Sequence, residues 1–133
     1  RYPGGVKGEI NEMVQNIDYA PTFLELAGVE TPNDIHGQSF LPLLKGEKYE
    51  SKRDGIYYHY YEFPDEHNVK PHLGLRTETH KLIHFYEDDV WELYDLLHDR
   101  NEINNIYGLE GTEEITKELK EKLKELQKQY GEN

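Results

Sequence analysis

Two histidines close together in one loop are the side chains of this sequence best suited to bind a ligand. His67 and His72 flank the four residues 68–71, and Arg76 follows a few positions later. Rings of His and of the neighbouring tyrosines can stack on the apolar faces of a sugar, while their polar atoms and Arg bind its hydroxyls. These residue types suit a sugar-binding edge around His67, His72 and Arg76. A surface loop whose histidines bind nothing is the alternative.

The sequence offers no complete nucleophilic site. Nucleophilic catalysis needs an activated Ser, Cys, Thr or Lys beside a base. The chain has no Cys, and neither Ser39 nor Ser51 lies in a Gly-x-Ser-x-Gly elbow. His36 comes three residues before Ser39, but a hydroxyl at this position is better explained as the cap of a following helical turn. We therefore expect no catalytic residue in this chain.

Metal sites and carboxylate pairs are also weakly supported. Zinc needs about three protein ligands, and the best available set, His72, His84 and Asp88, has a spacing that matches no zinc pattern. A glycosidase needs two carboxyls about 5 to 10 Å apart across a cleft. The acidic runs at 62–66 and 87–89 lie in expected turns, where we expect them to be solvated. We therefore expect no metal in this chain.

Hydrophobic spacing predicts the elements that position these side chains. Asp18 can cap a short buried helix over about 17–28, and Gly28 suits its end. Apolar residues at four- and three-residue spacing predict a last helix over about 112–130. Between the helices the period changes to two, which is typical of strands joined by short turns in an antiparallel meander. The predicted strands cover 55–63, 73–77, 81–86 and 90–96.

Together these elements predict an α+β fold. A small four-stranded antiparallel sheet packs against the long C-terminal amphipathic helix, and a short helix precedes the sheet. His59 and His84 each fall inside a predicted strand, so we expect them to be half-buried and hydrogen-bonded to neighbours.

Charge excludes several classes of partner. The chain has 133 residues with 27 acidic and 15 basic side chains, a formal net charge of −12. Such a chain repels phosphate backbones and anionic membranes, so nucleic acid and membrane partners are not expected. The same charge disfavours a polyanionic glycan unless basic residues cluster locally. No apolar run approaches the roughly 20 residues that span a bilayer.

Four stretches, in order and correctly spaced, resemble the C-terminal region of the sulfatase family, whose enzymes are arylsulfatase-like members of the alkaline phosphatase superfamily. The first resembles the helix D-x-x-P-T-x-L-x-L-A-G, the second follows it after a proline, the third resembles G-x-R-T…K-L-I, and the fourth resembles E-L-Y-D-L…D-P-x-E-x-x-N. They cover 14–29, 36–46, 74–86 and 91–105. Arg100 stands where the family usually has Pro, which affects a turn only.

The resemblance implies a division of the chain and a chemistry that it does not itself carry. Residues 1–46 correspond to the tail end of the sulfatase catalytic domain, and 47–133 correspond to its C-terminal subdomain. The family uses a formylglycine, made in a Cys/Ser-x-Pro-x-Arg motif, beside a calcium ion held by Asp and Asn. Neither feature is present in this sequence. Both are expected in a parent enzyme, and the missing N-terminal catalytic domain is the expected partner.

The functional expectation follows from this resemblance. The chain begins at Arg1 without Met, which favours a piece of a longer protein, and relatives are commonly secreted or periplasmic. We expect a C-terminal fragment of a sulfatase acting on a sulfated glycan or aryl sulfate, inactive alone and exposing an apolar patch. The loop around His72 resembles the stretch that contributes to the pocket rim. The resemblance therefore implies His72 first and His67 second as substrate contacts, with either a substrate contact or a structural role for Arg76. The alternatives are a stand-alone carbohydrate-binding or interaction module, and part of a related phosphodiesterase or phosphonate hydrolase.

Overall fold

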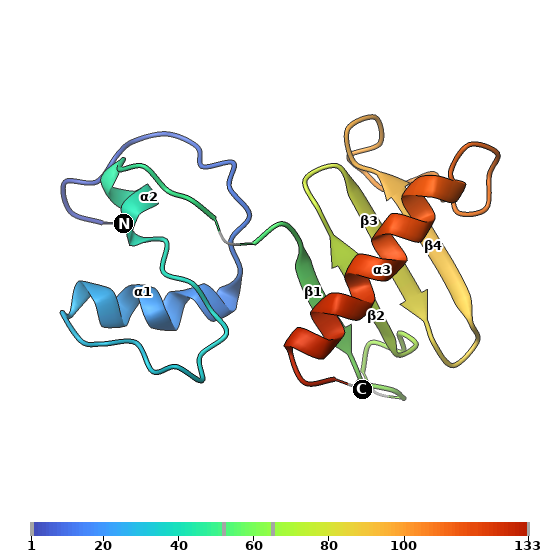
Figure 1. Cartoon of the computed structure of the whole chain (residues 1–133), viewed down its shortest axis with the longest axis horizontal. Helices are drawn as coiled ribbons and strands as arrows, with labels where there is room; N and C mark the ends of the chain where they lie inside the picture. The colour runs from blue at the N-terminus through green and yellow to red at the C-terminus, as the bar shows by residue number, and fades with distance from the viewer. Residues whose placement is uncertain (1, 52, 65, 133) are drawn as a thin grey trace. The chain divides into compact units, whose positions relative to one another are not determined.

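The computed structural model describes residues 2–51, 53–64 and 66–132, and it consists of two compact units (Figure 1). Unit 1 is Arg1–Arg53 and unit 2 is Asp54–Asn133. The boundary expected from the sequence, between 46 and 47, falls a few residues before this division. The assignment of the first part to a catalytic domain stays a prediction. No helix in the described ranges has the length and apolar character needed to cross a membrane.

Unit 1 contains a 3-10 turn and two short helices, η1 (Asn16–Asp18), α1 (Tyr19–Leu26) and α2 (Leu41–Lys45). The predicted helix over 17–28 is formed by η1 running into α1. Gly28 has a φ of 69°, the left-handed conformation expected where a helix ends.

The prediction that this helix is buried is wrong for the chain as it stands. Phe23 is 63% exposed and Tyr19 is 54% exposed. With Leu26, which is 41% exposed, they lie at four- and three-residue spacing and share one face of α1. Unit 1 has no sheet or further long helix among its described residues to cover that face. The result is the exposed apolar patch expected from the family resemblance.

A buried ion pair holds unit 1 together. The two terminal guanidinium nitrogens of Arg53, Nη1 and Nη2, each donate a 2.8 Å hydrogen bond to one carboxylate oxygen of Asp18, and the two side chains are 3% and 1% exposed. The same carboxylate accepts the backbone N–H groups of Gln15 at 2.7 Å and Gln38 at 2.9 Å. Asp18 is the last residue of η1, and its carboxylate closes this turn by accepting the N–H of Gln15, whereas it makes no side-chain cap bond to the first turn of α1, where the sequence predicted one. The carboxylate also joins three segments of unit 1.

These contacts also set the proton affinity of Asp18. Burial alone raises the pKa of its carboxyl, but the hydrogen bonds from Arg53, Gln38 and Gln15 outweigh burial and leave the pKa below its ordinary value. Because the pKa of Asp18 is lower in the folded state than in the unfolded state, the carboxylate stabilises unit 1 at pH values above its ordinary pKa. This stabilisation is lost as the pH falls through the folded pKa.

We therefore expect unit 1 to lose stability in acid. Nuclear magnetic resonance signals of α1 should persist from pH 7 to pH 5 and disappear near or below the ordinary Asp pKa of 3.8. Asp34→Asn, which removes an exposed carboxylate of the same unit, should leave this transition in place. Signals of α1 that persist unchanged at pH 2 would contradict the assigned role of Asp18.

Unit 2 is a sheet covered on one face by a helix (Figure 1). Neighbouring strands are hydrogen-bonded in the order β1-β2-β3-β4, and every pair is antiparallel, which confirms the predicted α+β meander. The helix α3 (Glu113–Gln129) packs its leucines on the sheet, as its spacing predicted. The strands are β1 (Ile56–Tyr60), β2 (His72–Arg76), β3 (His80–Phe85) and β4 (Val90–Asp95).

The core of unit 2 lies between α3 and the sheet. Leu75 and Leu82 are directly paired across β2 and β3, and Leu82 is paired with Leu93 on β4. All three are fully buried. Side chains alternate along a strand, so the residues next to these leucines point to the opposite face of the sheet. His72 belongs to that opposite face.

Gly74 lies on the same sheet face as His72, and the ring of Tyr58 packs against it. A Cβ atom added to Gly74 would lie 2.4 Å from the phenol carbon and hydroxyl of Tyr58. At this distance the half-buried ring of Tyr58 would have to shift. The absence of a side chain at this position is therefore a packing requirement.

Gly74→Ala is accordingly expected to destabilise unit 2 by about 1 to 3 kcal/mol, as overpacking does in a filled core. Urea unfolding followed by the fluorescence of Trp91, the sole tryptophan of the chain, measures this directly. Gly108→Ala is a useful comparison, because an added Cβ meets nothing within 4 Å there and only the positive φ of 76° opposes it. Equal unfolding free energies for wild type and Gly74→Ala would show that the sheet accommodates the methyl group.

Candidate functional site

His72 begins β2 and lies in a group of aromatic rings on the sheet face turned away from α3. Its ring stacks on Tyr60 at 5.3 Å between centroids, lies 5.0 Å from Phe85, and meets Tyr58 edge-on at 5.9 Å. Its Nδ1 lies 2.9 Å from the carbonyl oxygen of Lys70. A carbonyl only accepts, so Nδ1 carries the proton, and in the neutral ring Nε2 is left as an acceptor. His72 is thus oriented by the protein with one nitrogen available to a ligand.

Arg76 lies at the other end of β2 and on the same face as His72. The two are four residues apart, a separation of about 13 Å along a strand. Arg76 is exposed. A ligand longer than one sugar ring could contact both side chains, whereas a single small group could not.

His67 lies in the loop between β1 and β2. It is exposed, and it makes no hydrogen bond, ion pair or ring contact with the described residues. Lys70, in the same loop, forms an ion pair with Asp88 in the turn between β3 and β4. These two loops therefore lie side by side. Of the three predicted residues, His72 and Arg76 share a face of the sheet, and His67 contacts neither of them among the described residues.

A second group of polar rings surrounds Glu132, just after α3. Its carboxylate accepts hydrogen bonds from Tyr57, from Tyr61 at 2.6 Å and from Nδ1 of His59 at 2.7 Å. Burial raises the pKa of Glu132, but these donors outweigh burial and leave the pKa below its ordinary value. The side chain of His59 is 16% exposed, as expected of a half-buried sheet histidine. This group ties the end of α3 to β1.

The catalytic and metal alternatives weighed from the sequence find little support. The Oγ of Ser39 accepts the backbone N–H of Leu41 at 3.2 Å, the capping role expected for it. His84 is paired with Leu73 and lies on the α3 face, so it cannot share a site with His72. Across the described residues, no group of three His, Cys, Asp or Glu side chains is placed to hold a metal ion. The donors of this chain therefore do not fit the calcium that the resemblance implies.

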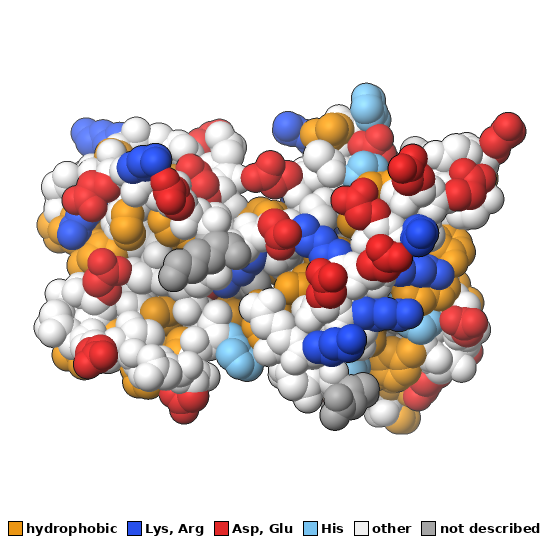
Figure 2. Space-filling model, in the orientation of Figure 1, with side chains coloured by type: hydrophobic (Ala, Val, Ile, Leu, Met, Phe, Trp, Pro, Cys, Tyr) orange, Lys and Arg blue, Asp and Glu red, His pale blue; other side chains and the backbone are white. Residues whose placement is uncertain are grey.

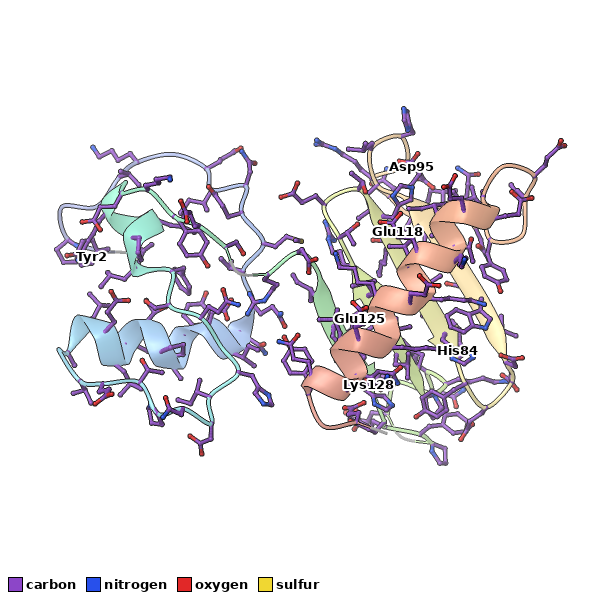
Figure 3. All side chains as sticks on the ribbon, viewed as in Figure 1. Tyr2, His84, Asp95, Glu118, Glu125 and Lys128 are labelled. Atoms are coloured by element: carbon purple, nitrogen blue, oxygen red, sulfur yellow. The ribbon has the colours of Figure 1, made fainter. Side chains whose placement is uncertain are left out.

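One feature of unit 2 was not predicted from the sequence. A hollow lies between α3 and the hairpin of β3 and β4, on the face opposite His72, and lysines and aromatic rings line it. Figure 3 shows His84 on this side of α3. The sequence signal for it is a row of lysines at three- and four-residue spacing within the helix.

Comparison with known proteins identifies the family. A model of the C-terminal region of N-sulphoglucosamine sulphohydrolase matches residues 1–129. The chain belongs to the sulfatase family. This match confirms the resemblance inferred from four sequence stretches. It also shows that the chain corresponds to the C-terminal part of a sulfatase.

Similar proteins agree with this assignment. An N-acetylglucosamine-6-O-sulfatase of Bacteroides thetaiotaomicron is 49% identical over the whole chain, which covers 25% of that protein. A solved structure of a protein with its substrate D-glucosamine-2-N,6-O-disulfate is 52% identical with a TM-score of 0.78, over 85% of this chain and 24% of that one. A phosphonate monoester hydrolase of Silicibacter pomeroyi has a TM-score of 0.79 over 100% of this chain and 29% of that one. At 24% identity, the last shows the shared fold alone. The chain thus spans about a quarter of the sulfatases that it matches.

Proposed function

We propose that this chain is the C-terminal part of an enzyme that hydrolyses sulfate esters on a sulfated, glucosamine-containing glycan. The observation that carries the proposal is the 52% identity, with a TM-score of 0.78, to a protein solved with D-glucosamine-2-N,6-O-disulfate. The chemistry would reside in the part of the relatives that this chain does not span. The formylglycine and the calcium ion implied by the family belong to that part.

Within this enzyme, His72 is proposed to contact the sugar at the rim of the substrate pocket. Its Nδ1 is fixed by the carbonyl of Lys70, and the rings of Tyr60 and Phe85 fix its plane. A ring held in this way loses little freedom when it binds a hydroxyl through Nε2. Arg76, on the same face, would contact a more distant unit or an anionic group. His67 would reach the ligand from the adjacent loop.

The proposed partner of this chain is the sulfatase catalytic domain. The proposed location is secreted or periplasmic, as is common among relatives. The exposed face of α1 supports the partner. Phe23 and Tyr19, each more than half exposed, would be costly to leave in water together with Leu26. A catalytic domain packed on α1 would remove this cost.

The alternatives make different predictions. A stand-alone carbohydrate-binding module needs a flat, exposed platform of rings, whereas Tyr58, Tyr60 and Phe85 are half-buried among one another. A phosphonate hydrolase or phosphodiesterase shares the fold and would act on phosphorus esters. Only a measurement of enzymatic activity distinguishes a phosphonate hydrolase or phosphodiesterase from the proposed sulfatase.

The test is to offer the longer protein that carries this chain an aryl sulfate, a phosphodiester and a phosphonate monoester of the same leaving group. We expect a kcat/KM for the sulfate well above those for the phosphorus esters. A preference for either phosphorus ester would replace the sulfatase proposal with the corresponding alternative.

A further inference from the structure

The hollow beside α3 combines charge and aromatic surface at one place in unit 2. Lys120 and Lys124 border it from the helix, Tyr107 from the preceding connector, and Tyr86 from the turn after β3. Its floor is apolar, with Leu73 and Leu123. Figure 2 shows blue, pale blue and orange surface adjoining along this flank of the helix.

Four groups in this hollow are stacked in a fixed order. The ring of His84 lies parallel to Trp91, 3.8 Å away at an angle of 9°, and the Nζ of Lys120 lies 3.8 Å from the centre of the same ring. Two groups so close to one ring must occupy its opposite faces. Tyr107 stacks on Trp91 at 6.1 Å and its ring centre lies 4.9 Å from the same Nζ, so the ammonium group contacts both rings. Lys120 donates one hydrogen bond to the hydroxyl of Tyr107 at 2.7 Å, which leaves its other two donors for a ligand.

The lysines of α3 form a row along the same flank. Their spacing of three, four and four residues keeps them within one side of a helix of 3.6 residues per turn. The flank next to this row carries Glu114, Glu118, Glu121 and Glu125, and Lys122 lies beside them. The row is Lys117, Lys120, Lys124 and Lys128. A chain with a net charge of −12 thus carries a local cationic row.

The one acidic side chain lining the hollow is already engaged. Asp89 accepts a hydrogen bond from Nε2 of His84 at 3.0 Å and from Nε1 of Trp91 at 3.2 Å. By contrast, Lys124 is exposed and has no ion pair or hydrogen bond within the described part of the chain. Two lysines and one carboxylate therefore line the hollow, so the net charge of its lining is positive.

We propose that this hollow between α3 and the β3–β4 hairpin is a binding site for an anionic sugar unit, sulfated or carboxylated. The amines of Lys120 and Lys124 would hold the anionic group, and Tyr86 and Tyr107 would contact the apolar faces of the ring. The local cluster of lysines meets the condition under which a chain of net negative charge can bind a polyanionic glycan. The site uses the sheet face opposite His72, so it does not depend on the proposed hydrolysis of a sulfate ester.

The test is a titration of the 133-residue chain with D-glucosamine-2-N,6-O-disulfate at constant ionic strength. Trp91 is the sole tryptophan and lies in the hollow, so its fluorescence reports on this site. We expect a saturable change with the disulfate and none with unsulfated D-glucosamine. No saturable change, or the same change with inorganic sulfate alone, would overturn the proposal of an anionic sugar site.

Variants separate local binding from general charge. Lys124→Gln should raise the dissociation constant about fivefold, the loss of one exposed ionic contact. Lys48→Gln removes the same charge from an exposed position of unit 1 and should not change it. His72→Ala should also leave the Trp91 response intact, so failure at this site and failure at the rim are distinguishable. Equal weakening by Lys124→Gln and Lys48→Gln would contradict a site in the hollow.

Discussion

Replacing Asp18 with Ala is expected to destabilise unit 1 by about 3 to 5 kcal/mol, the usual effect of removing one partner of a buried ion pair. The substitution leaves the charge of Arg53, whose side chain is 3% exposed, without its carboxylate. It also deprives the backbone N–H groups of Gln15 and Gln38 of their acceptor. Substituting both ionic residues by apolar ones would remove the stranded charge but not restore these acceptors.

Amide hydrogen exchange can measure this loss separately in each unit. Peptides from η1 and α1 should exchange much faster in Asp18→Ala, while peptides from α3 and the fluorescence of Trp91 should be unchanged. Asp34→Ala, at an exposed position of the same unit, is the matched control. Similar exchange in Asp18→Ala and Asp34→Ala would mean that the ion pair does not hold unit 1 together.

The second large effect is expected on substrate binding. His72→Ala, made in the longer protein that carries this chain, should raise KM for a sulfated glucosamine about tenfold and change kcat little. The magnitude corresponds to one lost hydrogen bond of about 1.4 kcal/mol. A contact that binds substrate and transition state equally affects KM rather than kcat.

His72→Gln and His80→Ala are the informative comparisons for this effect. Gln keeps a polar group that can bind a hydroxyl and should recover part of the affinity. His80 begins β3, at the far end of the strand from Phe85, and its Nδ1 lies 2.9 Å from the hydroxyl of Thr79. Its replacement should leave KM unchanged. A drop in kcat with unchanged KM for His72→Ala would place this residue in the chemistry instead of the rim.

Much of the fold could be predicted because its periodicity is local. The alternation along residues 72–95 follows from packing one sheet face on a helix, and the leucines of α3 repeat with the helical turn. The exposure of α1 could not be predicted in this way. An apolar stripe indicates that a face will be covered, but not whether the covering element belongs to the same chain.

The candidate site shows the same limit. His72, His67 and Arg76 were selected by residue type, and only the register of the strands assigns His72 and Arg76 to one face and His84 to the other. The ion pair between Asp18 and Arg53 joins residues that are 35 positions apart. No short sequence pattern predicts such a contact. The hollow beside α3 likewise depends on how the helix lies on the sheet, although the lysine spacing itself was visible.

This chain belongs to the sulfatase family, and we propose that it does not itself carry the catalytic chemistry. This proposal is tested most directly by sulfate release from D-glucosamine-2-N,6-O-disulfate, measured for the 133-residue chain and for the longer protein that carries it. We expect release by the longer protein and none by the chain alone. Sulfate release by the pure 133-residue chain would contradict it.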